Sequence, residues 1–399
     1  MKTLDNYLVE HKNILMRVDL NVPVVNKVVT EKSRIEIIKN TINRLQKQKN
    51  KIFLISHFGR PQGKKNTIYS LKFLCPTLEL EFGISRIFFA KSFDDIIIQE
   101  KLNEMKSSDI CLFENIRFHP GEENNDLNFI KAICKNFDVF INDAFSVSHR
   151  NHASIVGPPK FLPSLAGSSL LEEIKNIDMF VNNRKKPNIA IIGGSKISTK
   201  IALLNNLLKF CDAIIIGGAM ANTFLHAKNI NVGQSLCEKD LSSVALSILG
   251  KAIKYDCEII LPVDVICSSS INDQSNINNY DVNNIPSKSM ALDIGAKTIA
   301  LIGQSILNSK MILWNGPLGA FEYAPFDKSS IQIANKIKDN AKNLNISTLA
   351  GGGDTVSVIK LAKAEKGFDY ISKAGGAFLQ WLEGKGSFGV NALKDNKIN

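Results

Sequence analysis

Residues 349–362 read LAGGGDTVSVIKLA and join an apolar strand end, three glycines and a segment with apolar residues at helical spacing. This order is typical of a phosphate-binding loop in an α/β protein, because the amide groups and dipole of a helix N-terminus attract anions. Yet the first turn of the predicted helix carries Asp354, an acid, and no lysine follows it. The stretch therefore predicts a phosphate site whose positive charge comes from elsewhere and whose carboxylate has a task of its own.

Segments of the same two kinds alternate along the chain. Short β-branched and aromatic runs predict strands, and helix-period segments lie between them. In residues 33–48, SRIEIIKNTINRLQKQ, the side chains of Ile35, Ile38, Ile42 and Leu45 share one face. Ser33 and Glu36 there have the spacing of a capping box, which predicts a single helix with Ser33 as its N-cap. Continuous apolar strands alternating with helices indicate the α/β class, with parallel sheets covered on both faces.

The alternation restarts near residue 187, after a helical segment that ends in a polar, basic turn. We therefore predict two doubly wound, Rossmann-like domains joined by a hinge. The N-terminal domain spans residues 1–170, the connecting helix and hinge 171–186, and the C-terminal domain 187–383. The tail, residues 384–399, is expected to pack back on the N-terminal domain.

Composition narrows the class of protein. The 399 residues are 44% hydrophobic and 22% charged, which is typical of a globular protein. No apolar run approaches the length of a membrane span, and the first 20 residues lack the pattern of a secretion signal. The seven cysteines include no Cys-x-x-Cys pair, so the sequence indicates neither a zinc site nor a disulfide framework. A cytoplasmic location and no membrane association are expected.

The formal net charge of +11 allows two interpretations. A basic surface can bind nucleic acid. The lysines are dispersed, however, and no basic run is interleaved with aromatic residues, so a general bias toward lysine explains the charge and no nucleic-acid partner is expected.

The residues that follow the predicted strands differ between the two halves. In open α/β sheets ligands bind beyond the carboxyl ends of the strands. In the first half these positions are polar or charged: Asp19, Asn21, His57, Arg60, Arg117, His119, Asp143, His149 and Arg150. In the second half they are glycines: Gly193, Gly194, Gly217, Gly218, Gly316, Gly351, Gly352 and Gly353. One half is thus suited to a small, highly charged anion and the other to a nucleotide approached by backbone.

Three local patterns invite other interpretations. GRPQGKK, residues 59–65, resembles a Walker A loop but has three residues between its glycines and no Ser or Thr after Lys64. GKGSFG, residues 384–389, matches a dinucleotide fingerprint but leaves no room for the unit that should follow, so a turn is expected. His149 and His152 lack a nearby third metal ligand in the sequence.

The run of motifs resembles phosphoglycerate kinase from about Asn13 to Gly384. RVDLNVP and WNGPLGAFE are individually specific, and the order and spacing of the whole set reinforce them. The matching stretches are RVDLNVPV, SHFGRPQG, ENIRFHPGEE, NDAFSVSHRNHAS, IIGGSKISTK, IGGAMANTFL, LPVDV, LDIGAKT, WNGPLGAFE and GGGDT. The resemblance implies reversible, in-line transfer of a phosphoryl group between 1,3-bisphosphoglycerate and ADP, giving 3-phosphoglycerate and ATP. It also implies Mg²⁺ bound with the nucleotide, a monomer and catalysis by closure of the two domains.

The resemblance assigns roles to matching residues of the N-terminal domain. Asp19 and Asn21 are expected to bind the hydroxyl and carboxylate end of the glycerate. A basic cup follows, with Arg34 at the transferred phosphoryl; its members are Arg34, His57, Arg60, Arg117 and Arg150. Arginine suits this task because its planar fork pairs with carboxylate or phosphate through two hydrogen bonds.

In the C-terminal domain the resemblance implies that Lys200 contacts the nucleotide phosphates with Lys196 close by. Their spacing of four predicts that both lie on one helical face. Glu322 is expected at the ribose, Gly217 and Gly218 at the base, Asn315 near the phosphates and Asp354 at Mg²⁺. Gly352, Gly353 and Thr355 complete the predicted nucleotide site.

Some positions depart from the family pattern. Ser195, Ala219 and Ala296 replace a common alanine, glycine and proline, and Lys373-Ala374 replaces Thr-Gly near the hinge. A relative without activity that serves as a scaffold is the alternative, but it would require losses at Arg34, Lys200 or Asp354, and all three are present.

Overall fold

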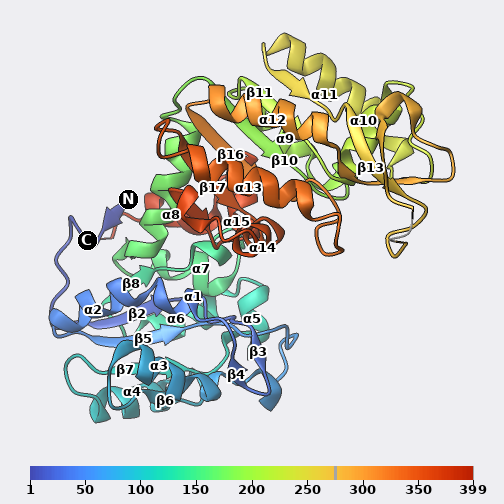
Figure 1. Cartoon of the computed structure of the whole chain (residues 1–399). Coiled ribbons are helices and arrows are strands. Elements are labelled where there is room, and N and C mark those ends of the chain that lie inside the picture. Colours follow the sequence, from blue (N-terminus) through green and yellow to red (C-terminus); the bar gives the residue numbers. More distant parts are fainter. Residues whose placement is uncertain (274–275, 399) are drawn as a thin grey trace. The chain divides into compact units, whose positions relative to one another are not determined.

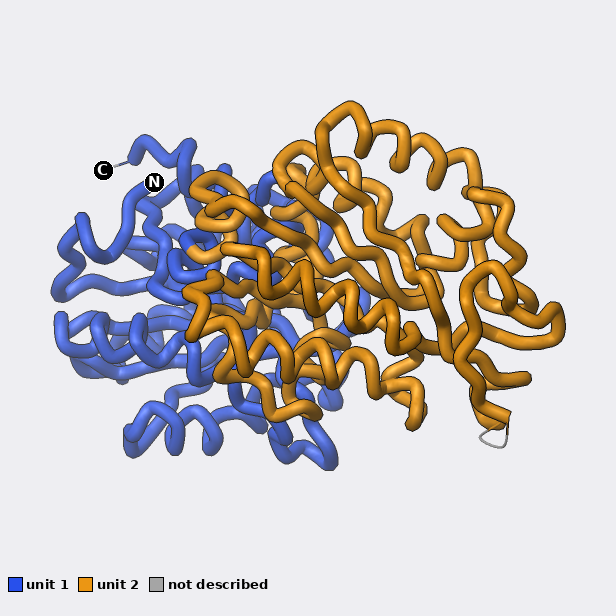
Figure 2. The backbone as a smooth tube through the Cα atoms, turned by 45° about the horizontal axis from the view of Figure 1, so that its top comes forward, with its two compact units in different colours: residues 1–175, 386–399 blue, residues 176–385 orange. Residues whose placement is uncertain are grey.

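The computed structural model describes residues 1–273 and 276–398. The chain divides into two compact units (Figure 2): unit 1 comprises residues 1–175 and 386–399, and unit 2 comprises residues 176–385. The division falls within helix α8 (Ser168–Val181).

Unit 1 is built on a seven-stranded, wholly parallel sheet with the order β1-β9-β8-β2-β5-β7-β6 (Figure 1). Its strands are β1 (Lys2–Thr3), β2 (Asn13–Arg17), β5 (Lys51–Ile55), β6 (Phe88–Ala90), β7 (Ile110–Phe113), β8 (Val139–Asn142) and β9 (Ser164–Ala166). A small hairpin adds β3 (Val24–Val25) and β4 (Val28–Val29). Along β2, Ile14 and Met16 pack in one apolar cluster and Leu15 in another, so both faces of the sheet are buried.

The helices of unit 1 supply the apolar side chains that cover these faces. They are α1 (Ser33–Glu36), α2 (Lys39–Lys47), α3 (Cys75–Phe82), α4 (Asp95–Glu104), α5 (Pro120–Glu123), α6 (Leu127–Cys134), α7 (Ala153–Val156), the first part of α8, and α16 (Phe388–Asp395). Short 3₁₀ turns are η1 (Thr67–Tyr69), η2 (Leu71–Leu74), η3 (Ile116–Phe118), η4 (Phe145–Val147) and η5 (Pro158–Lys160).

Unit 2 contains a six-stranded parallel sheet with the order β12-β11-β10-β16-β17-β18. Its strands are β10 (Asn188–Ile192), β11 (Ala213–Ile216), β12 (Glu258–Ile260), β16 (Met311–Asn315), β17 (Ser347–Gly351) and β18 (Tyr370–Ser372). A separate antiparallel sheet is formed by β13 (Asp264–Ser268), β14 (Asn278–Asp281) and β15 (Met290–Ile294). The α/β class and the two parallel sheets are confirmed, whereas the antiparallel sheet was not predicted.

The helices of unit 2 connect these strands. They are α9 (Ile201–Leu207), α10 (Ala219–Ala227), α11 (Ser242–Lys254), α12 (Ala296–Asn308), α13 (Lys328–Asn340), α14 (Gly353–Leu361) and α15 (Gly376–Leu382). The 3₁₀ turns are η6 (Ile197–Thr199), η7 (Lys239–Leu241), η8 (Val282–Asn284) and η9 (Glu365–Gly367).

Each parallel sheet has a point where its strand order reverses. In unit 1 this point lies between β2 and β8, and in unit 2 between β10 and β16. Crossovers leave such a pair of strands in opposite directions, which opens a crevice at their carboxyl ends. The two places where sites are expected are therefore the loops after β2 and β8 and the loops after β10 and β16.

The predicted helix over residues 33–48 is wrong in two respects. The four apolar side chains are buried as expected, but the helix is divided into α1 and α2 at Ile37 and Ile38. Ser33 is the first residue of α1 and not its N-cap, and its amide donates to the carboxylate of Glu31 at 2.8 Å. Because an acid upstream caps this end, the predicted capping box with Glu36 does not form.

Candidate active site

Asp19 lies just after β2 and is the centre of the polar cluster in unit 1. Its carboxylate is 2.8 Å from Nη1 of Arg34 and accepts hydrogen bonds from the Ser146 hydroxyl at 2.5 Å and the Asn21 amide at 3.0 Å. Burial alone would raise the pKa of Asp19, but the positive charge of Arg34 and these hydrogen bonds lower it below its usual value. Asp19 is therefore an anchored carboxylate that holds Arg34 in place.

Asn21 and Arg117 secure the loop that follows β5. The side-chain oxygen of Asn21 accepts from the Gly59 amide at 2.9 Å, and Nη1 of Arg117 donates to the Gly59 carbonyl at 2.8 Å. Gly59 has φ +61°, and a Cβ there would collide with the Tyr69 ring, so no larger residue fits. The main chain of Asn21 also accepts from Arg34 at 2.8 Å. These hydrogen bonds thus connect the loops that follow β2, β5 and β7.

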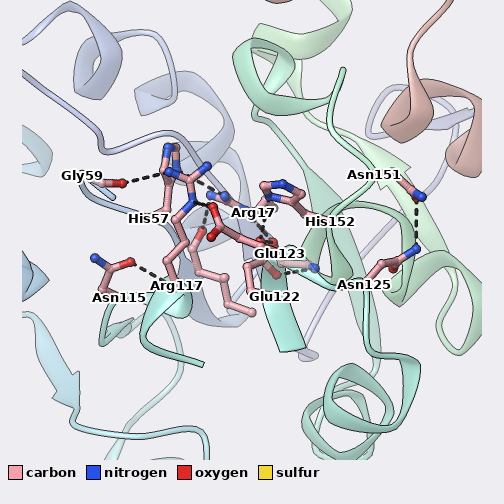
Figure 3. A network of polar contacts seen from close by, with 12 residues as sticks. Arg17, His57, Gly59, Asn115, Arg117, Glu122, Glu123, Asn125, Asn151 and His152 are labelled. Atoms are coloured by element: carbon pink, nitrogen blue, oxygen red, sulfur yellow. Dashed lines mark hydrogen bonds and ion pairs between the residues drawn. The ribbon is translucent and has the colours of Figure 1, made fainter. Parts of the chain in front are cut away.

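His57 follows β5 and is only 3% exposed. Its Nδ1 lies 3.4 Å from Nη2 of Arg17, the last residue of β2 (Figure 3). Burial lowers the pKa of His57 well below its usual value, and the positive charges of Arg17, Arg117 and Arg150 add to that effect against the opposing Asp19. His57 is consequently neutral at physiological pH.

The remaining arginines of the predicted cup differ in burial. Arg117 is 3% exposed and forms an ion pair with Glu123 at 3.3 Å, and burial together with Arg150 lowers its pKa to about 10. Arg150 is half-buried, and its Nε is buried without a hydrogen-bond partner among the described residues. Arg60 is exposed. Direct contacts thus join Asp19, Asn21 and Arg34. Asn21 and Arg117 both bind Gly59. Arg150 affects its neighbours through its positive charge.

Three buried residues beside this cluster were not predicted. Arg17 is 2% exposed, and its Nε donates to the Ser154 hydroxyl at 2.9 Å. Ser154 in turn donates to Glu122, which is fully buried, at 2.7 Å. An arginine at the end of an otherwise apolar strand was a signal in the sequence, because a buried charge requires partners. Its partners lie 105 and 137 residues away and only the fold brings them together.

In unit 2 two glycines at the reversal point permit a close approach of the backbone. Gly193 follows β10 and Gly316 follows β16. A Cβ on Gly193 would collide with the Pro317 carbonyl, and one on Gly316 would collide with the Gly193 carbonyl. Gly316 also has φ +99°, a conformation that side chains rarely adopt. The close approach of these two loops explains the requirement for glycine at both positions.

Lys200 is the basic group of this region. It is half-buried, and its Nζ donates to the side-chain oxygen of Asn315, whose own amide donates to the Gly351 carbonyl at 2.6 Å. Burial lowers the pKa of Lys200, and the negative charge of Asp354 opposes this. Lys200 and Asp354 therefore act on each other electrostatically although they lie 154 positions apart.

The prediction that Lys196 and Lys200 share a helical face is wrong. Lys196 is extended, with φ −136° and ψ 130°, and precedes η6, whereas Lys200 ends that turn and begins α9. Lys196 is exposed and Lys200 is half-buried. A 3₁₀ turn lies between them, so their spacing of four does not have its usual helical meaning.

Helix α14 begins directly after β17. Gly352 precedes it with φ +101°, and a Cβ on Gly353 would meet nothing within 4 Å, so the space beside this helix start is open. Asp354 lies exposed in the first turn, and the buried Thr355 hydroxyl accepts from the Gly316 amide at 2.7 Å. Of the other predicted residues, Gly217 and Gly218 follow β11, and Glu322 is exposed beyond β16. The structure thus brings Asn315 and Thr355 close to Gly352, with Gly353 and Asp354 exposed beside them.

No helix among the described residues is both long and apolar enough to cross a bilayer.

Two parallel α/β units, one with a buried basic cluster and the other with glycines at its strand ends, form a protein of the α/β class suited to anionic ligands. The family model described as phosphoglycerate kinase matches residues 4–385. The phosphoglycerate kinases of Sinorhizobium fredii and Brucella melitensis are 43% identical over 397 residues and 42% identical over 393 residues; the matches cover 99% and 98% of this chain and 99% of each relative. The chain belongs to the phosphoglycerate kinase family.

Solved structures give the same result. The phosphoglycerate kinase of Coxiella burnetii matches with a TM-score of 0.90 at 31% identity, over 98% of both chains. That of Pyrococcus horikoshii matches with a TM-score of 0.83 at 24% identity, over 99% of this chain and 98% of the other, and supports the fold. The reaction is the reversible transfer of a phosphoryl group between 1,3-bisphosphoglycerate and ADP, giving 3-phosphoglycerate and ATP, a step of glycolysis.

Proposed function

We propose that unit 1 binds the phosphoglycerate and unit 2 binds the nucleotide, and that closure of the two units aligns the reacting groups in line. The ion pair between the buried Asp19 and the half-buried Arg34 carries this proposal, since it presents a guanidinium held by a carboxylate at the carboxyl end of a parallel sheet. Phosphoryl transfer needs positioning and positive charge around the transferred group more than it needs covalent chemistry.

Within unit 1, Asp19 and Asn21 bind the hydroxyl and carboxylate end of the glycerate. Arg34 neutralises the transferred phosphoryl, and the other members of the cup bind the remaining anionic groups; these are His57, Arg60, Arg117 and Arg150. The Nε of Arg150 supports this assignment, because it has no hydrogen-bond partner among the described residues and a buried guanidinium donor is costly unless a ligand accepts from it. Arg117 is also buried, and the low dielectric of a buried site strengthens the attraction between its charge and an anion.

Within unit 2, Lys200 contacts the nucleotide phosphates, with Lys196 nearby in the open loop before η6. Gly352, Gly353 and Thr355 admit the phosphates to the start of α14, and Asn315 orients Lys200. Glu322 accepts from the ribose, and Gly217 and Gly218 line the base pocket. The open space at Gly353 and the hydrogen bond between Lys200 and Asn315 support these roles.

Asp354 is the residue that would hold Mg²⁺. An exposed carboxylate beside an open helix N-terminus fits this ion, which prefers one or two carboxylates together with phosphate oxygens. Bound there, Mg²⁺ would neutralise phosphate charge. Lys200 would then share that charge with α14 amide groups, and closure would exclude water from the transfer.

The proposed domain bounds agree with the assignment of phosphoglycerate to unit 1 and nucleotide to unit 2. We propose that residues 171–186 form the connecting helix and hinge, between an N-terminal domain over 1–170 and a C-terminal domain over 187–383. The tail, residues 384–399, belongs to the N-terminal domain, which is supported by a hydrogen bond of 2.8 Å from the Ser387 hydroxyl to the Ser148 carbonyl. The protein acts as a cytoplasmic monomer without a nucleic-acid partner.

A coupled assay tests the proposal. ATP and 3-phosphoglycerate are supplied with and without Mg²⁺, and ADP is measured together with titrations of each substrate alone. We expect turnover only with Mg²⁺, and we expect Arg34→Ala to lose turnover while still binding nucleotide. Unchanged kcat in Arg34→Ala would contradict the role assigned to Arg34, and turnover without Mg²⁺ would contradict the role of Asp354.

A further inference from the structure

Four buried residues from distant parts of unit 1 form a chain of hydrogen bonds that ends at His57. Figure 3 shows three of them, Glu122, Arg17 and His57. Glu122 is fully buried, Ser154 is fully buried, and Arg17 and His57 are 2% and 3% exposed. The distances along the chain are 2.7 Å, 2.9 Å and 3.4 Å. His57 is assigned to substrate binding, whereas Arg17, Ser154 and Glu122 have no role in the mechanism derived so far.

The donor at each step follows from the chemistry of the groups. The Glu122 carboxylate only accepts, so the Ser154 hydroxyl hydrogen points to it. The Ser154 oxygen is then free to accept from Nε of Arg17. A guanidinium only donates, so Nδ1 of His57 accepts from Nη2 of Arg17. A neutral imidazole whose Nδ1 accepts carries its proton on Nε2.

We propose that Glu122, Ser154 and Arg17 are positioning residues that hold His57 as the neutral Nε2–H tautomer, so that His57 offers the phosphoglycerate an uncharged N–H donor. The inference rests on the proposed place of His57 in the substrate site. It adds that the substrate contact depends on the position of one proton, which is set by residues that do not touch the substrate.

The charges around His57 favour the same state. The groups that face it are Arg17 from β2, Asp19 after β2, Arg117 from η3 and Arg150 after η4. Three positive charges and burial oppose protonation, and the negative charge of Asp19 favours it. Glu122 supplies the negative charge that compensates the buried Arg17. Burial lowers the pKa of Arg17, and among the neighbouring charges Glu122 raises it most.

Two amide substitutions at His57 distinguish the roles of the two imidazole nitrogens. In His57→Gln the terminal amide replaces Nε2 and keeps a neutral donor there, whereas in His57→Asn the amide replaces Nδ1 and leaves the Nε2 position empty. We expect the KM for 3-phosphoglycerate to rise by about threefold or less in His57→Gln and by about ten- to a hundredfold in His57→Asn, the range of one hydrogen bond to a charged group. The KM for ATP should not change in either variant.

The tautomer is measured directly by long-range ¹H–¹⁵N correlation of the full chain labelled in its six histidines. His57 is assigned by the signals missing in His57→Gln. We expect the pattern of a neutral Nε2–H imidazole at pH 7 to 8. In Ser154→Ala, Arg17 loses its acceptor at Nε, so a second tautomer should appear and the KM for 3-phosphoglycerate should rise about three- to tenfold.

Ser70→Ala is the matched control, because the Ser70 hydroxyl also donates to a buried glutamate, Glu114, at 2.7 Å but has no contact with Arg17. It should leave both the tautomer and the KM unchanged. Arg17→Lys provides a second variant if Ser154→Ala does not fold: it keeps the charge, lacks Nε and should also mix the tautomers.

The two proposals fail in different ways. An Nδ1–H tautomer or an imidazolium at His57 in the unaltered protein would overturn the inference, as would equal losses in His57→Gln and His57→Asn. An Nε2–H tautomer together with an unchanged KM in both variants would instead overturn the proposed place of His57 in the substrate site.

Discussion

The guanidinium of Arg34 is held in one orientation by two contacts, although arginine side chains usually lie free on the surface. Its Nη1 lies 2.8 Å from both the Asp19 carboxylate and the Asn21 carbonyl, so the guanidinium is oriented before a ligand arrives. Preorganised positive charge is effective in phosphoryl transfer because no reorganisation is needed as charge develops. The sequence indicated Arg34 through its motif, but its two acceptors are known only from the structure.

Replacing Arg34 should therefore affect turnover more than nucleotide binding. We expect Arg34→Ala to lower kcat by about 10²–10³-fold, the usual effect of removing one preorganised donor, and to change the KM for ATP by about twofold or less. Steady-state kinetics in both substrates measure this. Arg44→Ala is the control, since Arg44 also pairs with an aspartate, Asp5, in unit 1 but contacts none of the site residues. A comparable loss of kcat in Arg44→Ala would show that the effect of Arg34 is not specific to the site.

His152 should make stability depend on pH. Burial and the charges of Arg117, Arg150 and Arg17 lower its pKa to about 4, even though its Nδ1 is 3.8 Å from Glu122. The unfolded chain binds the proton near pH 6.5 and the folded chain only near pH 4. The unfolded state thus holds more protons in between, and the free energy of unfolding falls as pH drops from about 6.5 to about 4.

His152→Gln should remove part of that dependence. We expect the difference in unfolding free energy between pH 7 and pH 4.5 to shrink by on the order of 1 kcal/mol, allowing for partial solvent screening. Urea unfolding at the two pH values measures it. His119→Gln is a suitable control because His119 is exposed. An equal pH dependence in His152→Gln and the unaltered protein would contradict the lowered pKa.

Among the helices and strands, the turn from β17 through glycine into α14 is the element whose structure its own sequence predicted best. The stretch 349–362 gives β17, a glycine turn and α14, as its sequence predicted, and the structure adds a positive φ at Gly352. By contrast, residues 33–48 gave a broken helix and residues 196–200 gave a 3₁₀ turn. Period and spacing report which residues are buried, whereas helix ends depend on single hydrogen bonds such as that from Ser33 to Glu31.

Asp354 at the start of α14 leads to a prediction about the metal. Asp354→Asn keeps a side-chain oxygen but removes the charge, so we expect the Mg²⁺ concentration for half-maximal rate to rise by about tenfold, equivalent to about 1.4 kcal/mol. Asp327→Asn is the matched control, because Asp327 also stands at the start of a helix of unit 2, α13, and makes no side-chain cap bond. An unchanged Mg²⁺ requirement in Asp354→Asn would contradict the assignment of Asp354 to the metal.

Considered as a whole, the chain returns to its first unit at its end. Helix α16 packs its buried Val390 and Leu393 in unit 1, and the Gly389 amide donates to the Ser148 carbonyl at 2.8 Å. A Cβ on Gly389 would press on Ile155 of α7, so this contact requires a glycine. Residues that are more than 230 positions apart therefore share one folding unit.

Loss of this contact should destabilise unit 1 in particular. We expect Leu393→Ala to lower its free energy of unfolding by about 2–5 kcal/mol, whereas Phe388→Ala, at an exposed position in the same helix, should have little effect. Both tryptophans, Trp314 and Trp381, lie in unit 2, so tryptophan fluorescence follows unit 2 and amide hydrogen exchange is needed for unit 1. A loss seen in Leu393→Ala only by tryptophan fluorescence would contradict the assignment of α16 to unit 1.

The sequence by itself determined the α/β class, the buried face of residues 33–48 and the family, because period, composition and motif order are properties of short segments. Only the tertiary structure revealed that Arg17 reaches Ser154 and Glu122, that Lys200 binds Asn315, and that Lys196 and Lys200 do not share a helical face. It also supplied the antiparallel sheet of β13, β14 and β15. The reason is physical: these features depend on hydrogen bonds and backbone geometry between groups far apart in the chain, whose partners no local pattern specifies. The glycines of 349–362 predicted a phosphate site, but the fold alone brings Lys200 close enough to act on Asp354.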